Sequence, residues 1–461
     1  ASLALVVAFS SCKKDDPNNN GSTPTEELKL TASTDAEKVQ QIDKIELTAS
    51  GSRVTAAPNQ VAWLVNGKQV AKGAKYTFIP PLPGNYTVIL RAGNREITRK
   101  YTVAEPRFTK GAFLLNEGNG TDNVETGTLT YVDVKGKVIL DSAYIHVNGT
   151  KLGHVCQDLA FANEKIYIIS QNGKRNGGEG LLTIAKANTL EKIKVFNDAT
   201  LEAKDPTHIA VIDSRIYLRA GDGVYLGTED GSFKIIAGTE KAQKLRMATI
   251  GQRVFVSTSD KKLLMIQGDR VVQTLALDEK ATGLALADDG NLWVSISKDG
   301  NNNQILKVSA DPADFKILDK QTITPSLHNY TTASVIQPYG NSLYFAVAAW
   351  GKPVSIQKYD FTAKTNTLFV NLQESSYASE MKTYYNSLGV DPKTGYIYYA
   401  GIKGFGMDYK TNMTFVLDPQ GNVLVKKDNT NSFPAGWYFI TNEVKPSPRH
   451  RITTTGRTPF C

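Results

Sequence analysis

The sequence predicts an all-β protein with a large repeated domain preceded by a smaller one. Short runs of apolar and β-branched residues alternate with polar positions and are separated by turn residues, which is typical of strands. Tyrosines (20) outnumber phenylalanines (17), and 37 glycines punctuate the 461 residues, a composition that favours strands joined by turns. A strand–turn–strand unit with a central aromatic residue recurs along residues 110–440. Hydrophobic residues make up 41% of the chain, enough for a substantial core.

The chain opens with an apolar stretch, residues 1–9, which is too short to span a bilayer as a helix. We interpret it as the end of a secretory signal peptide. Small residues Ser10 and Ser11 precede Cys12, and this arrangement resembles a bacterial lipobox. We therefore expect residues 1–12 to be a partial lipoprotein signal peptide with Cys12 as the lipidated residue. The alternative is an ordinary signal peptide that contains a cysteine.

Residues 13–27 contain no large apolar side chains, so we expect a flexible tether. The segment Lys14-Asp15-Asp16 resembles the surface-export signal of Bacteroidota lipoproteins. This resemblance implies a protein that is lipid-anchored in the outer membrane and exposed at the cell surface. The membrane would be contacted through the lipid anchor only.

Residues 28–105 predict a small immunoglobulin-like β-sandwich. Six short β-rich runs are separated by turn signals, among them Asn66-Gly67 and Pro83-Gly84-Asn85. The stretch 83–88, Pro-Gly-Asn-Tyr-Thr-Val, resembles the start of a strand in PKD-type domains. Trp63 is expected in the core of this domain.

Residues 110–440 predict a seven-bladed β-propeller. Six units carry central aromatic residues that recur every 38–54 residues, close to the length of a four-stranded blade. These residues are Tyr167, Tyr217, Phe255, Trp293, Tyr344 and Tyr398. Residues 112–144 supply three more strands and residues 433–440 a lone one, so the two ends are expected to complete a seventh blade and close the ring. We expect the tail, residues 441–461, to be disordered.

Charge and motifs exclude several functions. The net charge of +8 comes from 53 basic and 45 acidic residues without a long run of like charges, which argues against nucleic-acid binding. The cysteines form no Cys-x-x-Cys pair, and Cys156 is expected to be a small buried residue. GxSxG, HExxH, Walker A and GxGxxG motifs do not occur in a suitable context. We therefore expect no enzymatic activity, no cofactor and no metal site.

A ligand is expected on the propeller face where loops from all blades converge on the axis. Loop residues there combine amides, aromatic rings and basic groups, which suits a bulky ligand with planar and hydrogen-bonding parts. Each could instead form a turn or cap a loop, and Trp350, in a Gly/Pro loop, is the best single candidate. The candidates are Asn116, Glu117, His154, Asn172, Arg175, His208, Arg219, Arg246, Tyr330, Trp350 and Tyr385.

Four stretches of the repeated domain carry a family resemblance: 113–119 (FLLNEGN), 127–133 (GTLTYVD), 152–159 (LGHVCQDL) and 433–439 (FPAGWYF). They resemble the YncE-like surface lipoproteins of Bacteroidota, whose BtuG-type members capture cobalamin and deliver it to a TonB-dependent transporter. The resemblance implies capture of a small-molecule nutrient, with a corrinoid as the best single ligand and such a transporter as partner. The sandwich departs from the BtuG type, so haem, siderophores, peptides and glycans stay open as ligands.

Two other functions remain open at this stage. A glycan-binding or adhesive surface protein would show an exposed aromatic strip on one face. A propeller hydrolase or lyase would bring His, Asp or Glu side chains within hydrogen-bond reach of one another.

Overall fold

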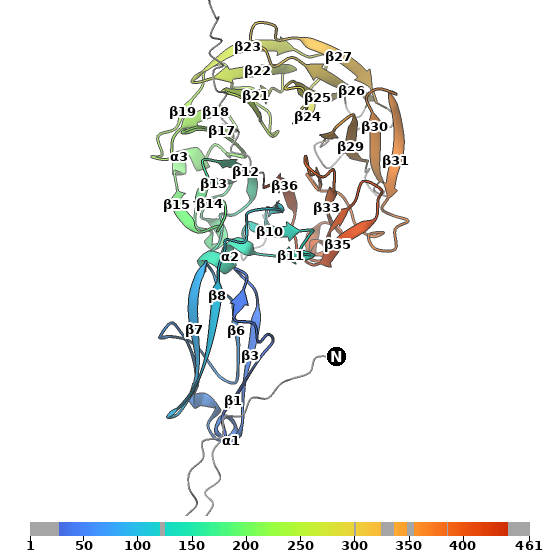
Figure 1. Ribbon diagram of the computed structural model, residues 1–461. Coiled ribbons are helices and arrows are strands. Elements are labelled where there is room, and N and C mark those ends of the chain that lie inside the picture. Colours follow the sequence, from blue (N-terminus) through green and yellow to red (C-terminus); the bar gives the residue numbers. More distant parts are fainter. Residues whose placement is uncertain are drawn as a thin grey trace, which may run out of the picture. The chain divides into compact units, whose positions relative to one another are not determined.

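The structure is a computed structural model that describes residues 27–119, 125–298, 301–323, 336–347, 355–384 and 386–440 (Figure 1). The expectations for Cys12, the tether and the tail lie outside these residues. The chain forms two compact units, one built mainly from residues up to Ala104 and one from Glu105 onward. The short segments Gln40–Ile42 and Pro81–Pro83 belong with the second unit.

The first unit contains two β-sheets and a shared apolar core. Trp63 is fully buried in this core, as predicted, and its indole nitrogen donates to the Gly73 carbonyl at 2.8 Å. Asn66 and Gly67 both have positive φ angles, which a tight hairpin turn between β4 and β5 requires. One sheet has the order β1 (Lys29–Ala32), β3 (Ile45–Ser50) and β6 (Lys75–Phe78). The other has the order β2 (Lys38–Val39), β8 (Arg95–Val103), β7 (Gly84–Ala92), β4 (Val61–Val65) and β5 (Lys68–Lys72).

The described residues of the second unit form seven four-stranded antiparallel sheets. One sheet contains β9 (Ala112–Asn116), β10 (Thr128–Asp133), β11 (Val138–Leu140) and β36 (Pro434–Phe439). The other six sheets each contain four consecutive strands. Two of them are β12 (Cys156–Ala162), β13 (Lys165–Ser170), β14 (Leu182–Lys186), β15 (Lys192–Phe196); and β16 (His208–Ile212), β17 (Arg215–Ala220), β18 (Gly223–Gly227), β19 (Lys234–Ile235). The next two are β20 (Ala248–Ile250), β21 (Arg253–Ser257), β22 (Lys262–Gln267), β23 (Arg270–Ala276); and β24 (Ala281–Leu286), β25 (Leu292–Lys298), β26 (Asn301–Val308), β27 (Ile317–Thr322). The last two are β28 (Ile336–Tyr339), β29 (Ser342–Val347), β30 (Ser355–Asp360), β31 (Thr365–Asn371); and β32 (Leu388–Val390), β33 (Ile397–Ile402), β34 (Asn412–Leu417), β35 (Val423–Asp428).

The first strands of these sheets lie around a common centre (Figure 1). Contacts link β12 to β16, β16 to β20, β20 to β24, β24 to β28, β28 to β32, β32 to β36, and β36 back to β12. The last strand, β36, pairs with β9, so that Tyr438 lies opposite Phe113 and Trp437 opposite Leu114. This pairing of the two ends of the unit was predicted from the sequence. The arrangement is all-β and propeller-like.

The recurring aromatic residues hold neighbouring sheets together. Each lies in the second strand of its sheet and is at most 7% exposed. Tyr217, for example, shares a buried cluster with Val254 of the next sheet. Trp293 stacks on Phe361 of the next sheet with ring centroids 4.0 Å apart. One large ring per sheet therefore fills the space between two sheets, which explains the spacing seen in the sequence.

Helices are few and short in the part of the chain that the structure describes. They are α1 (Ser52–Ala56), α2 (Ala143–Asn148), α3 (Ala199–Glu202) and the 3-10 turns η1 (Pro58–Gln60), η2 (Arg175–Gly177) and η3 (Gly406–Lys410). The Asp198 carboxylate caps α3 by accepting from two backbone N–H groups. Of these described helices, none has the length and apolar character needed to cross a membrane.

Candidate functional site

A pocket lies on the axis of the second unit, and every one of the seven sheets contributes to its lining. It is a small cavity of about 70 Å³ that opens to solvent. Its residues come from the first strands or from the segments next to them, because these are the parts of each sheet nearest the axis. They are Glu117, Gln157, His208, Lys244, Leu245, Arg246, Thr282, Gly283, Leu284, Ile336, Gln337, Asn386 and Ala435.

Glu117 is the acidic group of this axial pocket. It follows β9 and is 7% exposed. Its carboxyl accepts hydrogen bonds from Gln157 Nε2 at 2.6 Å and from Tyr384 Oη at 2.8 Å. Burial raises the pKa of Glu117 to about 7, although both hydrogen bonds and the charge of Lys244 act in the opposite direction. The carboxyl therefore changes its charge near neutral pH.

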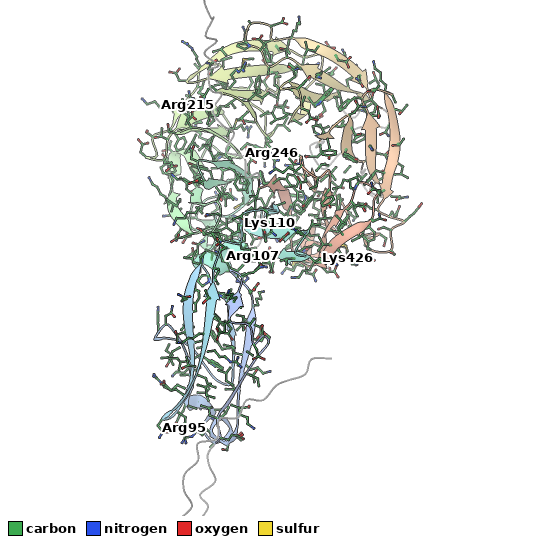
Figure 2. The ribbon with its side chains drawn as sticks, viewed as in Figure 1. Arg95, Arg107, Lys110, Arg215, Arg246 and Lys426 are labelled. Atoms are coloured by element: carbon green, nitrogen blue, oxygen red, sulfur yellow. The ribbon has the colours of Figure 1, made fainter. Side chains whose placement is uncertain are left out.

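Two cations, Lys244 and Arg246, line the pocket just before β20. The Lys244 ammonium lies 3.4 Å from the Gln171 amide oxygen. The Arg246 side chain is 30% exposed, and its guanidinium lies 4.4 Å from the centroid of the Tyr438 ring. Figure 2 shows Arg246 near the centre of the ring of sheets, whereas Arg215 lies at its outer edge. Positive charge is thereby brought to the axis.

Arg246 also connects the pocket to a buried carboxylate, Asp158, which is 1% exposed. Asp158 lies 3.3 Å from Arg246 Nε, accepts from Tyr438 Oη at 2.5 Å and accepts from the Ile209 N–H at 3.0 Å. Burial raises the pKa of Asp158, against the opposing effects of Arg246 and Tyr438. Gly436 lies beside this cluster, and a Cβ atom there would displace the Arg246 guanidinium, since it would lie 2.2 Å from Nη2. The cluster joins residues from four sheets.

His208 is the imidazole of the axial pocket and is 6% exposed. Its Nδ1 pairs with the Thr207 hydroxyl at 2.9 Å. Burial, together with the charges of Arg246, Arg219 and Lys244, lowers the pKa of His208 well below its ordinary value. His208 is therefore neutral at physiological pH and can offer a hydrogen bond without adding charge.

The structure brings three of the predicted site residues into the axial pocket: Glu117, His208 and Arg246. Arg175 is exposed in η2, outside the pocket lining. Tyr330, Trp350 and Tyr385 lie outside the described residues.

Four other predicted site residues bond to the protein itself and lie outside the pocket lining. The Asn116 amide donates to the hydroxyls of Thr128 and Thr130. His154 is 2% exposed and interacts with the Asn119 carbonyl and the Asn172 side chain, and Arg219 donates to the Ala242 carbonyl. These four side chains, which were predicted to contact a ligand, thus stabilise loops and neighbouring sheets.

Sequence reasoning missed several residues that line the pocket, among them Lys244, Thr282, Gln337 and Asn386. Asn386, for example, donates to the Ala435 carbonyl at 2.8 Å and so bridges two sheets at the axis. A usable signal was available: each of these residues lies at or shortly before the first strand of its repeat unit. Comparing that one position across all units would have found them.

The chemistry of the lining suits a polar, anionic group. The pocket offers two cations, a neutral imidazole, three amide side chains and one carboxyl that is partly protonated near neutral pH. Among the described residues, His, Cys, Asp and Glu side chains form no group of three that could hold a metal ion.

Fold and site together define an all-β, propeller-like protein with a polar pocket on its axis. The chain belongs to the family described as Domain of unknown function (DUF5074), whose model matches residues 110–441. It is similar in structure to a quinonprotein alcohol dehydrogenase-like protein from Bacteroides thetaiotaomicron, with a TM-score of 0.56 and 17% identity over 88% of this chain and 96% of that chain. A periplasmic gluconolactonase from Pseudomonas aeruginosa matches with a TM-score of 0.48 and 13% identity over 72% of this chain and 99% of its own. No curated protein matches the sequence. At 17% identity, the similarity to the Bacteroides thetaiotaomicron protein shows the fold alone.

Proposed function

We propose that this protein is a cell-surface lipoprotein that captures a nutrient carrying an anionic group, and that the group enters the axial pocket. The observation that carries the proposal is the pairing of Lys244 and Arg246 at the axis of a pocket lined by all seven sheets. In this proposal the sheets are the blades of a seven-bladed propeller, and residues 28–105 form an immunoglobulin-like spacer of the PKD type.

The local charge balance favours an anion over a cation. Lys244 contributes a positive charge, the charge of Arg246 is shared with the buried Asp158 carboxylate, His208 is neutral, and Glu117 is only partly ionised near pH 7. A carboxylate or phosphate group in the pocket would meet charged donors and amides at once. Hydrogen bonds that involve a charged partner are roughly twice as strong as neutral ones, so these contacts can fix the orientation of a ligand.

The pocket is small, and its size limits how a large ligand can bind. A cavity of about 70 Å³ admits a small polar substituent and is far too small for a corrin ring. A corrinoid, the ligand that the YncE-like and BtuG-type resemblance favours, would therefore lie across the loop face and place one anionic group in the pocket. Anchoring through Cys12 and delivery to a TonB-dependent transporter belong to the same proposal and rest on the sequence.

Calorimetric titration of the full-length chain with cobalamin, haem and a panel of small carboxylates and phosphates tests this proposal. At least one anionic ligand should bind, and Lys244→Ala should weaken its binding by about tenfold or more, since a charged hydrogen bond is lost. Lys426→Ala is the matched control, because Lys426 is exposed on β35 away from the pocket. Equal effects of the two substitutions, or binding of uncharged glycans alone, would contradict the proposal.

A hydrolase or lyase is the second candidate, because Glu117 and His208 line the same pocket. Their contacts favour binding over catalysis: the Glu117 carboxyl is hydrogen-bonded to Gln157 and Tyr384, and His208 Nδ1 pairs with Thr207. Turnover of a lactone or ester substrate that disappears in Glu117→Gln would establish the catalytic alternative.

A further inference from the structure

A group of aromatic side chains adjoins the axial pocket. Tyr384 donates its hydroxyl to Glu117 Oε2, which places it at the pocket. Its ring contacts Phe433 at a centroid distance of 5.0 Å and Phe405 at 5.9 Å. Phe433 in turn stacks on Tyr409, with centroids 4.7 Å apart and planes inclined by 22°. A continuous path of ring contacts therefore leads away from the pocket.

The ring contacts branch at Tyr384: the branch that reaches Phe405 ends at an exposed, apolar residue, whereas the branch through Phe433 ends at the buried Tyr409. Phe405 is 39% exposed and the neighbouring Met407 is 65% exposed, while Tyr384 and Phe433 are partly exposed. Single exposed apolar residues are common on proteins. Here Phe405 and Met407 lie two residues apart in one segment, and Phe405 is joined through Tyr384 to a polar pocket, so that apolar and polar surface adjoin as they do in ligand sites. We call Tyr384, Phe405, Met407 and Phe433 the aromatic shelf.

The backbone of Phe433 links the aromatic shelf to Glu117. Phe433 has a φ angle of 53°, a left-handed conformation that a bulky side chain rarely adopts. Its carbonyl accepts from the Glu117 N–H at 3.0 Å, so the strained residue is tied directly to the acidic group of the pocket. This hydrogen bond is one of the contacts that hold Phe433 in its conformation.

We infer that the ligand carries a flat, apolar ring system that lies on the aromatic shelf while its anionic group occupies the axial pocket. This inference rests on the proposed function and names the class of ligand: an amphipathic anion with a planar part. Aromatic rings bind flat apolar surfaces by stacking, and the flexible thioether of Met407 adapts to their outline. Charge complementarity comes from Lys244 and Arg246 in the adjoining pocket.

Three probes separate the two parts of the site: pyrene-1-sulfonate, which has both groups; 1-pyrenemethanol, which lacks the charge; and methanesulfonate, which lacks the ring. Binding to the full-length chain is measured by pyrene fluorescence and by calorimetry. Pyrene-1-sulfonate should bind more tightly than either of the other two by about tenfold or more, since both parts of the site contribute. Equal binding of 1-pyrenemethanol would contradict the inference and the anionic pocket together.

Variants then assign the effect to the shelf. Phe405→Ala and Met407→Gln should each weaken pyrene-1-sulfonate binding by about threefold to tenfold and leave methanesulfonate unchanged. Leu368→Ala is the control, because Leu368 is 58% exposed on β31, in another sheet. Phe405 and Met407 are exposed, so both variants should remain folded. Unfolding midpoints equal to that of the unsubstituted protein would verify this.

The remaining outcomes distinguish the shelf from the pocket. If Lys244→Ala weakens binding but the two shelf variants behave like Leu368→Ala, the shelf assignment is wrong and the proposed function stands. If small anions or glycans bind while pyrene-1-sulfonate does not, the shelf assignment is again wrong. If none of the anions binds, the proposed function fails and the inference fails with it.

Discussion

At the scale of single residues, Glu117 shows how burial changes the pKa of a carboxyl in the axial pocket. Its carboxyl is held in a position where three favourable contacts do not fully offset the cost of removing the charge from water. A carboxyl that titrates near pH 7 and lies close enough to Lys244 to be affected by its charge makes the charge of the pocket depend on pH. Sequence reasoning identified Glu117 as a candidate but could not foresee this property, which depends on partners 40 and 267 residues away along the chain.

The raised pKa of Glu117 predicts a pH dependence of stability. Between pH 4.5 and about 7 the folded protein retains a proton that the unfolded chain has lost, so the free energy of unfolding falls as the pH rises through this window. The decrease in the free energy of unfolding reaches about 3 kcal/mol above pH 7 and then stays constant. Glu117→Gln should remove this part of the decline, which urea unfolding at pH 5 and pH 8 would measure.

The exposed Glu374 provides the matched control, because Glu374→Gln should leave the decline in place. The buried Asp158, whose pKa is also raised, contributes a decline of the same sign in every variant. A Glu117→Gln protein with an unchanged pH profile would show that the Glu117 carboxyl titrates in its ordinary range.

At the scale of elements, much of the second unit could be predicted from the sequence. The repeated strand pattern and its aromatic residues are local signals, and the structure places Tyr167, Tyr217 and Trp293 in second strands as the pattern indicated. The pairing of β36 with β9 could also be predicted, because the start of the unit supplies three strands of a sheet and its end supplies the fourth. Individual site residues were harder to predict, since a polar side chain at a loop can face the axis or form hydrogen bonds with other groups of the protein. Asn116 and His154 do the latter.

The contacts between sheets at the axis depend on Arg246, which comes from the segment before β20 and pairs with Asp158 of β12. Arg246→Met would leave the buried Asp158 carboxylate without its cation. We expect a loss of about 3 kcal/mol in the free energy of unfolding, the lower end of the range for removing one partner of a buried ion pair. Chemical denaturation would measure it. The control is Arg215→Met, since Arg215 lies at the outer edge of the ring in Figure 2; it should lower the free energy of unfolding by less than about 1 kcal/mol. Similar losses in both variants would show that the Arg246–Asp158 pair does not stabilise the protein more than a surface residue does.

At the scale of the whole molecule, the pocket is a property of ring closure. Its lining residues are spread from Glu117 to Ala435, and they meet only because seven first strands surround one axis. A site of this kind has no contiguous sequence motif, because its residues come from separate repeat units. This also explains why only Glu117, His208 and Arg246 of the predicted site residues line this pocket.

The most direct test of the account is a crystal structure of the full-length chain bound to 4-iodobenzenesulfonate, whose iodine can be located by anomalous scattering. The account predicts the sulfonate in the axial pocket beside Lys244 and Arg246, with the iodinated ring directed toward Phe405 and Tyr384. An iodine position away from the axis, with the pocket free of the sulfonate, would contradict the claim that this pocket is the ligand site.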